Sequence, residues 1–254
     1  MKTIVIAAGY ATRLYPLTEN FPKPLLEIGK STILDRLLDD IDTIPEVDGH
    51  IVVTNHKFAG IFRKWAEKRP NVTILDDGTS TNETRLGAVR DLILALETFG
   101  IDEDILVVAA DNILDFSLRG FVEEFKRRGT SMIMCHHEPE LCKLQRTGVI
   151  EVDESMRVLQ MQEKPEDPVS HWAVPPFYIY RREDLPLIRT SIACGCGYDA
   201  PGNLAHYLVD KTIVHAWPMP GGRFDIGSLD TYEEARGRYG NRGNIENAPA
   251  CFDR

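Results

Sequence analysis

The chain has 254 residues, of which 43% are hydrophobic and 27% are charged, so it can bury a substantial core without disulfides or structural metals. Its formal net charge of −10 argues against a nucleic-acid partner, because an acidic surface repels phosphate backbones. The same charge means that a site for any anionic substrate needs local cations, backbone N–H groups or a metal ion.

The sequence contains no pattern typical of a membrane span or of a secretory signal peptide. No apolar stretch approaches the ~20 residues of a membrane span, and the short N-terminal apolar run ends at Gly9, too early for a signal peptide. The five cysteines are an odd number, and Cys194-Gly-Cys196 has no second close pair to complete a zinc site. We therefore expect reduced thiols, a cytoplasmic location and no membrane partner.

The first half of the chain alternates between strand and helix signals. Residues 3–8 form an apolar, β-branched run that is typical of a buried parallel strand. Ser31 or Thr32 can cap a helix whose apolar positions recur at helical spacing. Further strands are predicted at 51–53, 72–75 and 105–110, and further helices at 57–68, 83–98 and 117–128. This alternation predicts an α/β fold with a doubly wound, mostly parallel sheet.

The rhythm changes after about residue 130. Short turns separate strands predicted at 131–135, 149–152, 158–163 and 177–180, and helices are predicted at 201–210 and 228–237. This pattern predicts a smaller mixed β region at the edge of the first sheet. We expect a single domain over residues 1–240 and a loose tail over 241–254, which is polar and contains Gly and Pro.

The loop from Ala8 to Leu14 directly follows the first predicted strand. Its small residues would let backbone N–H groups approach a phosphate chain closely. Arg13 adds a planar cationic fork that suits phosphate oxygens. From these residues alone, an ordinary strand–helix loop with a surface arginine is an equally good interpretation.

Pro22-Lys23-Pro24 places one lysine between two residues that restrict the backbone. A rigidly held ammonium group suits the stabilisation of charge that develops in a transition state. The alternative interpretation is a solvated lysine in a loop.

Two carboxylates are candidates for metal binding. Asp111, followed by Asn112, comes directly after the strand at 105–110, and ligands of open α/β sheets bind at the carboxyl ends of strands. Asp225 lies between apolar neighbours next to Gly227, and a buried carboxylate needs a partner such as Mg²⁺. The alternatives are a turn-capping role for Asp111 and a helix-capping role for Asp225.

The order of these motifs resembles that of the sugar-phosphate nucleotidyltransferases, and of the glucose-1-phosphate thymidylyltransferase branch in particular. The resemblance extends from residue 1 to about 238. It rests on the segments Gly9 to Thr18, Pro22-Lys23-Pro24, Asp111-Asn112-Ile113, Gly148-Val149, Glu163-Lys164-Pro165 and Phe224-Asp225-Ile226-Gly227.

The resemblance implies a Rossmann-like, GT-A-like fold in which residues 1–130 bind the nucleotide and residues 131–240 bind the acceptor. Arg13, Lys23 and Asp111 would be catalytic, and Asp111 and Asp225 would hold Mg²⁺. The implied nucleotide site consists of Ala8, Gly9, Tyr10, Ala11, Thr12, Arg13, Asn82, Gly87 and Asp111. The implied acceptor site consists of Asn112, Gly148, Glu163, Lys164, Val174 and Tyr178.

The resemblance also implies a reaction, in which a nucleoside monophosphate passes from an NTP to a sugar 1-phosphate and pyrophosphate is released. The chain departs from the family pattern at Asn82, where glutamine is usual, and at Pro175-Pro176, where Thr-Gly is usual. It also lacks the arginine that the family places near residues 200–202. A cytidylyltransferase for a non-sugar phosphate and a non-catalytic nucleotide-sugar sensor are the alternatives. The sequence does not determine the base, the acceptor or the oligomeric state, for which a homo-oligomer is one alternative.

Overall fold

The computed structural model describes residues 1–240, which group into two compact units. The sheet unit comprises residues 1–9, 46–109 and 121–219, and the ribbon unit comprises residues 10–45, 110–120 and the described residues from Pro220 onward. The expected single domain, with a change of role near residue 130, stays a prediction. The expected tail at 241–254 lies outside the described residues.

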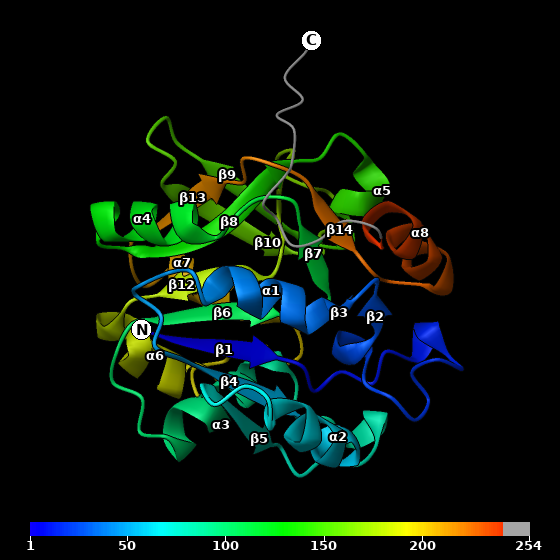
Figure 1. Ribbon diagram of the computed structural model, residues 1–254. Coiled ribbons are helices and arrows are strands. Elements are labelled where there is room, and N and C mark those ends of the chain that lie inside the picture. Colours follow the sequence, from blue (N-terminus) through cyan, green and yellow to red (C-terminus); the bar gives the residue numbers. More distant parts are fainter. Residues whose placement is uncertain (241–254) are drawn as a thin grey trace. The chain divides into compact units, whose positions relative to one another are not determined.

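One ten-stranded sheet forms the frame of the sheet unit (Figure 1). Its order is β10-β9-β11-β8-β12-β6-β1-β4-β5, with β13 paired to β8. Strands β6, β1, β4 and β5 run parallel, and β12 joins them antiparallel at β6. The strands are β1 Lys2–Ile6, β4 Gly49–Thr54, β5 Val72–Asp76, β6 Ile105–Ala109, β8 Ser131–His137, β9 Gly148–Val152, β10 Val158–Glu163, β11 Trp172–Val174, β12 Phe177–Tyr180 and β13 Val214–Pro218.

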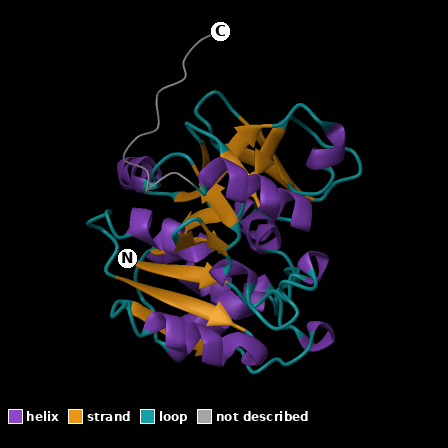
Figure 2. Ribbon diagram, turned by 45° about the vertical axis from the view of Figure 1, so that its right-hand side comes forward, coloured by secondary structure: helices purple, strands orange, loops and turns teal. Residues whose placement is uncertain are grey.

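Helices cover both faces of this sheet (Figure 2). The chain crosses outward from β4 to β5 through α2 and returns from β5 to β6 through α3, so right-handed connections place these helices on opposite faces. The helices are α2 His56–Ala66, α3 Ala88–Thr98, α4 Arg119–Arg128, whose first two residues belong to the ribbon unit, α5 Leu141–Leu144, α6 Leu185–Thr190 and α7 Pro201–Val209, with 3₁₀ turns at Asn82–Thr84 and Arg182–Asp184.

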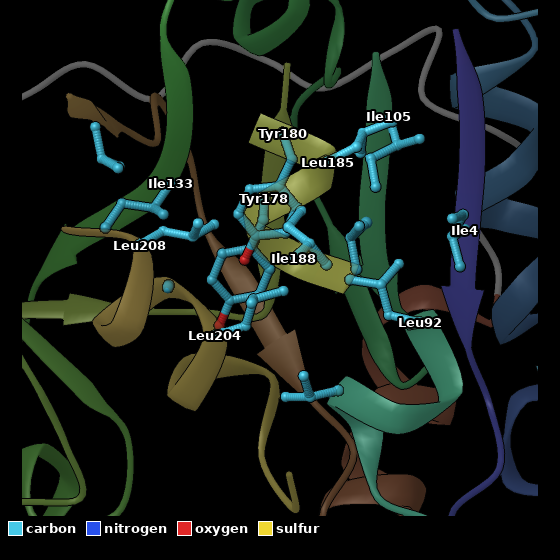
Figure 3. Close-up of a cluster of buried hydrophobic side chains, with 14 of the residues drawn as sticks. Ile4, Leu92, Ile105, Ile133, Tyr178, Tyr180, Leu185, Ile188, Leu204 and Leu208 are labelled. Atoms are coloured by element: carbon cyan, nitrogen blue, oxygen red, sulfur yellow. The ribbon is translucent and has the colours of Figure 1, made fainter. Parts of the chain in front are cut away.

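The main hydrophobic core lies between one face of the sheet and helices α3, α6 and α7 (Figure 3). Tyr178 and Tyr180 extend from β12 into this core, and their rings stack 5.8 Å apart. The core also contains Ile4, Leu92, Ile105, Ile133, Leu185, Ile188, Leu204 and Leu208. Successive strand residues face opposite sides, so Trp217, which follows Ala216 of this core, stacks on Phe121 of α4 at the other face.

The ribbon unit consists of two short β-ribbons, β2–β3 and β7–β14, together with two helices. Thr32 and Asp35 form a capping box at the start of α1. This confirms the helix cap predicted at residue 31 or 32. The elements are 3₁₀ turns at Thr12–Leu14 and Lys23–Leu25, β2 Glu27–Ile28, β3 Ser31–Thr32, α1 Ile33–Ile41, β7 Asn112–Leu114, β14 Arg223–Asp225 and α8 Leu229–Tyr239. Their own core holds Leu14, Leu26, Ile28, Ile33, Ile113, Ile226, Tyr232, Ala235 and Tyr239.

The α/β fold class predicted from the sequence is confirmed, and strands β10 and β12 have the predicted bounds. The predicted helix boundaries agree with the structure to within two residues, except for one that was wrong by more than a turn. The helix expected at 83–98 begins at Ala88, because Gly87 has a φ of 91° that ends any helical path before it. The elements that were not expected at all are helices α5 and α6 and strands β2, β3, β7, β11 and β13. Within residues 1–240, no helix is both long and apolar enough for a membrane crossing.

A buried acid lies in the sheet unit at Asp91 of α3. Only 3% of Asp91 is exposed, and its Oδ1 atom has no hydrogen-bond partner. Burial, together with the negative charge of Asp77, raises the pKa of the Asp91 carboxyl to about 7. The folded protein therefore holds this proton more tightly than the unfolded chain does.

We expect Asp91→Asn to remove a pH dependence of stability. A raised carboxyl pKa contributes stability that is full below about pH 4 and is lost as the pH rises to about 7. Between pH 5 and pH 8 the wild-type free energy of unfolding should fall, relative to the variant, by up to roughly 2–3 kcal/mol. Urea unfolding at both pH values measures this difference, with the exposed Asp210→Asn as control. An equal change in both proteins would contradict the prediction.

Candidate functional site

Lys23 lies in a rigid part of the ribbon unit. It begins the 3₁₀ turn Lys23–Leu25, after Pro22 in an extended conformation and before Pro24. Lys23 is 9% exposed, and its Nζ atom donates to Asp111 Oδ2 at 2.9 Å. An ammonium group has three N–H donors, so this contact leaves two for other anions.

The β7–β14 ribbon brings the two candidate metal ligands to one end of the ribbon unit. Asn112 pairs with Asp225 across the ribbon, and the Ile226 amide donates to the Asp111 carbonyl oxygen at 3.2 Å. Asp111, directly before β7, and Asp225, the last residue of β14, are therefore close in the fold although 113 intervening residues separate them in the sequence. Backbone pairing, rather than the flexible side chains, fixes their proximity.

The electrostatics of this end of the ribbon are those of a crowded carboxylate pair. Asp225 remains exposed to solvent, yet desolvation by its neighbours and the charge of Asp111 raise the pKa of its carboxyl. Lys23, Arg223 and Arg13 act on that pKa in the opposite direction. Two carboxylates that repel each other, with cations beside them, are suited to share a divalent cation.

The donor set fits Mg²⁺ better than a softer metal. Among residues 1–240, no three His, Cys, Asp or Glu side chains gather as a metal site. Mg²⁺ is commonly held by one or two carboxylates, with substrate phosphates and water completing its shell, so a pair of Asp residues is sufficient for it. The four described cysteines are free and supply no alternative cluster.

The predicted phosphate loop divides between the two units. Ala8 and Gly9 belong to the sheet unit, where the Ala8 carbonyl accepts from Asn55 Nδ2 at 3.0 Å. Tyr10 to Arg13 belong to the ribbon unit. There Ala11 has a left-handed φ of 47°, and its carbonyl accepts from Thr18 Oγ1 at 2.8 Å. Thr12 and Arg13 are exposed, so both side chains are accessible to a ligand.

Sequence reasoning missed Arg223, which completes a hydrogen-bonded chain through Asn112. Arg223 Nη1 donates to Asn112 Oδ1 at 2.6 Å, and Asn112 Nδ2 donates to Asp111 Oδ1 at 2.7 Å. Asn112 is buried, and both ends of its amide are used inside the ribbon unit, so its predicted acceptor role stays a prediction. The only sequence signal for Arg223 was its place two residues before Asp225.

In the sheet unit, the residues predicted to read the base lie just before α3. Asn82 begins a 3₁₀ turn and is half-buried, and its carbonyl accepts from Arg85 Nη1 at 3.0 Å. Gly87 is the N-cap of α3 and is buried. A Cβ atom at residue 87 would lie 2.5 Å from the Tyr198 carbonyl oxygen, so only glycine fits here.

The predicted acceptor residues of the sheet unit cluster around Glu163 at the end of β10. Gly148 pairs with Glu163 across the β9–β10 ladder, and Lys164 Nζ lies 3.9 Å from Glu163 Oε1. Burial raises the pKa of the Glu163 carboxyl, whereas the charges of Lys164 and His206 lower it. Val174 and Tyr178 are almost fully buried, at 3% and 2% exposure, so they back this cluster from the core side.

Helix α7 contributes two residues that sequence reasoning did not select. A Cβ atom at Gly202, in the first turn of α7, would lie 1.8 Å from Glu163 Oε2, so glycine is what admits the carboxylate. One turn later, exposed His206 makes a hydrogen bond through Nδ1 to the Met161 carbonyl oxygen. Gly202 and His206 therefore lie on the side of α7 that faces β10.

The family of the chain follows from a comparison of its sequence with protein families. The model of the family described as "Nucleotidyl transferase" matches residues 2–241. The chain belongs to the nucleotidyl transferase family. This match covers nearly the whole chain and includes both units.

Individual relatives within this family are distant in sequence. The chain is 26% identical to UTP–glucose-1-phosphate uridylyltransferase AglF of Haloferax volcanii, covering 94% of this chain and 96% of the relative. It is also 26% identical to a glucose-1-phosphate adenylyltransferase of Fervidobacterium nodosum, of which it spans 59%. A solved UDP-glucose pyrophosphorylase complexed with UDP-glucose has the same fold, with a TM-score of 0.79, 20% identity and coverage of 94% and 97% of the two chains.

We expect Arg223→Ala to destabilise the protein by about 1–3 kcal/mol, because it leaves the buried Asn112 Oδ1 without its donor. Urea unfolding measures the loss. Arg63→Ala serves as the control, since the exposed Arg63 side chain makes a surface ion pair with Asp76 and should change stability by less than about 0.5 kcal/mol. Equal effects of the two substitutions would argue against a structural role for the Arg223–Asn112 contact.

Proposed function

We propose that this protein is a magnesium-dependent nucleotidyltransferase that forms an NDP-sugar from an NTP and a sugar 1-phosphate. The observation that carries the proposal is the contact of Lys23 with Asp111, beside Asp225, at one end of the β7–β14 ribbon. The family match supports the chemistry, and the printed activities of the relatives support a sugar 1-phosphate as acceptor.

The reaction is an in-line displacement. A phosphate oxygen of the acceptor attacks the α-phosphorus of the NTP, a new P–O bond forms, and the bond to the β-phosphate oxygen breaks to release pyrophosphate. The acceptor phosphate is already ionised near neutral pH, so no side chain needs to remove a proton. Catalysis then consists of positioning two anions and offsetting the negative charge that develops.

Each charged residue of the ribbon unit has a distinct role. Lys23 donates its two remaining N–H groups to oxygens of the α-phosphate, and Arg13 binds the pyrophosphate that leaves. Asp111 and Asp225 would hold Mg²⁺, which when bound offsets the charge of the triphosphate. Asn112 and Arg223 keep the Asp111 carboxylate in one orientation, through the hydrogen bonds described above.

The residues of the sheet unit supply recognition. Asn82 and Gly87 contact the base, and the predicted acceptor residues of this unit, together with Gly202, form the acceptor pocket around Glu163. A Glu163 carboxylate accepts hydrogen bonds from sugar hydroxyl groups, and Lys164 adds a positive charge for the sugar phosphate.

We expect Asp111→Asn, Asp225→Asn and Lys23→Ala each to lower turnover roughly 100-fold or more, because each removes a group that offsets transition-state charge. Pyrophosphate release is measured with UTP, dTTP, ATP, GTP and CTP against sugar 1-phosphates and a phosphorylated amino alcohol. The exposed Asp230→Asn should leave turnover within about twofold. Release with CTP and the amino alcohol alone would support the cytidylyltransferase alternative. No release from any pair would favour the sensor alternative and sink the proposal.

We expect Gly202→Ala to weaken acceptor binding selectively. The added Cβ displaces the Glu163 carboxylate, and losing a hydrogen bond to a charged group costs about 1.5–3 kcal/mol, or roughly 10–100-fold in the acceptor KM. The KM for the NTP should change by less than about twofold. Gly60→Ala on α2, where no atom lies within 4 Å of the added Cβ, is the matched control. Equal increases in both KM values would contradict a local effect on the acceptor.

A further inference from the structure

The start of helix α3 is capped by a segment from far along the sequence. Gly87 has no side chain with which to cap the helix, so the first N–H groups of α3 need other acceptors. Ala88 N donates to the Asp199 carbonyl and Val89 N to the Tyr198 carbonyl, both at 3.0 Å. Residues 198–199 thus supply the helix cap that residue 87 does not.

The side chains of the same two segments are also joined. Arg85 Nε and Nη2 both lie 3.0 Å from Asp199 Oδ1, while Arg85 Nη1 donates to the Asn82 carbonyl. All three guanidinium nitrogens are therefore engaged, and they hold Asn82 and Asp199 together. The Arg90 guanidinium lies over the Tyr198 ring, 3.9 Å from its centroid, in a cation–π contact.

The segment that caps α3 leads directly into the acceptor cluster. Ala200 is the N-cap of α7, and Gly202, in the first turn of the helix, faces Glu163. Only two residues, at positions 200 and 201, separate the residue that binds Arg85 from the residue that admits the Glu163 carboxylate. A shift of the base-reading residues would therefore be transmitted through Arg85 and Asp199 to the first turn of α7.

We propose that Arg85 and Asp199 are positioning residues that couple the binding of the nucleotide to the binding of the acceptor. This inference rests on the proposed function. Nucleotide bound at Asn82 and Gly87 holds Arg85 in place, Arg85 holds the 198–199 segment, and that segment holds Gly202 against Glu163. The first substrate to bind meets the free-energy cost of ordering this segment, so the second substrate binds more tightly. Each substrate therefore raises the affinity for the other by the same factor.

The test measures that factor by calorimetry on the full-length protein with Mg²⁺. The probes are the α,β-methylene analogues of UTP, dTTP, ATP, GTP and CTP, with glucose 1-phosphate and mannose 1-phosphate as acceptors. In the wild type, a bound analogue should lower the acceptor Kd at least fivefold. In Arg85→Ala and Asp199→Asn that factor should fall to less than about twofold, and Arg85→Lys should recover only part of it, because lysine lacks the guanidinium fork.

The control is Arg182→Ala, which breaks an exposed ion pair with Asp102 in the same unit, away from both segments. It should leave the factor unchanged. A merely structural role for Arg85 would lower the melting temperature or weaken both ligands equally, without changing the factor. A wild-type factor near one, or a factor kept in Arg85→Ala, overturns the inference while leaving the proposed function intact. If the wild type binds no analogue, the proposed function fails, and the inference fails with it.

Discussion

The ribbon unit is organised around the contact between the Lys23 ammonium and the Asp111 carboxylate. Lys23 is almost fully buried, and burying an ammonium group is costly unless an anion compensates for it. Asp111 supplies that anion at 2.9 Å, and Asn112 and Arg223 fix its other oxygen. The carboxylate that compensates for the lysine is also the one whose charge raises the pKa of Asp225, so one residue links charge burial to the predicted metal site.

This arrangement explains how a chain with a net charge of −10 can present a site for anions. Its acidic residues are distributed over the whole chain, whereas Arg13, Lys23 and Arg223 all act on a single carboxylate, Asp225. Local cations outweigh a distant negative surface because screening by salt limits the reach of exposed charges to about 8–10 Å. The net charge therefore indicates which partners are unsuitable, but it does not describe the field at the site.

The parts of the fold that could be predicted from the sequence are those that depend on local periodicity. The helix at 33–41 and the strands at 158–163 and 177–180 follow from the spacing of apolar residues and from caps such as Thr32. The start of α3 could not be predicted, because the apolar spacing of the residues after Asn82 is helical. The helix begins only at Ala88, since Gly87 has a left-handed φ and packs closely against the Tyr198 carbonyl. That contact depends on a segment more than a hundred residues away.

The same distinction applies to the candidate site. Lys23, Asp111 and Asp225 were selected because their types and flanking residues are unusual, and the structure brings them to one end of the ribbon unit. Gly202 and Arg85 have no such flanking signal, and Arg223 has only its place two residues before Asp225. Each is defined by a partner that only the folded chain supplies.

Gly202 illustrates the consequence for the acceptor. The absence of the family's arginine near residue 200 suggested a pocket that had lost a group. In the folded chain, Gly202 has no side chain and leaves room for the Glu163 carboxylate. His206 lies one helical turn further along α7. A half-buried carboxylate beside Lys164 and an imidazole favours an acceptor rich in hydroxyl groups that also carries a negative charge. An acceptor with a quaternary ammonium group would instead need the aromatic faces that bind such cations, and Tyr178, stacked on Tyr180 in the core, does not offer one.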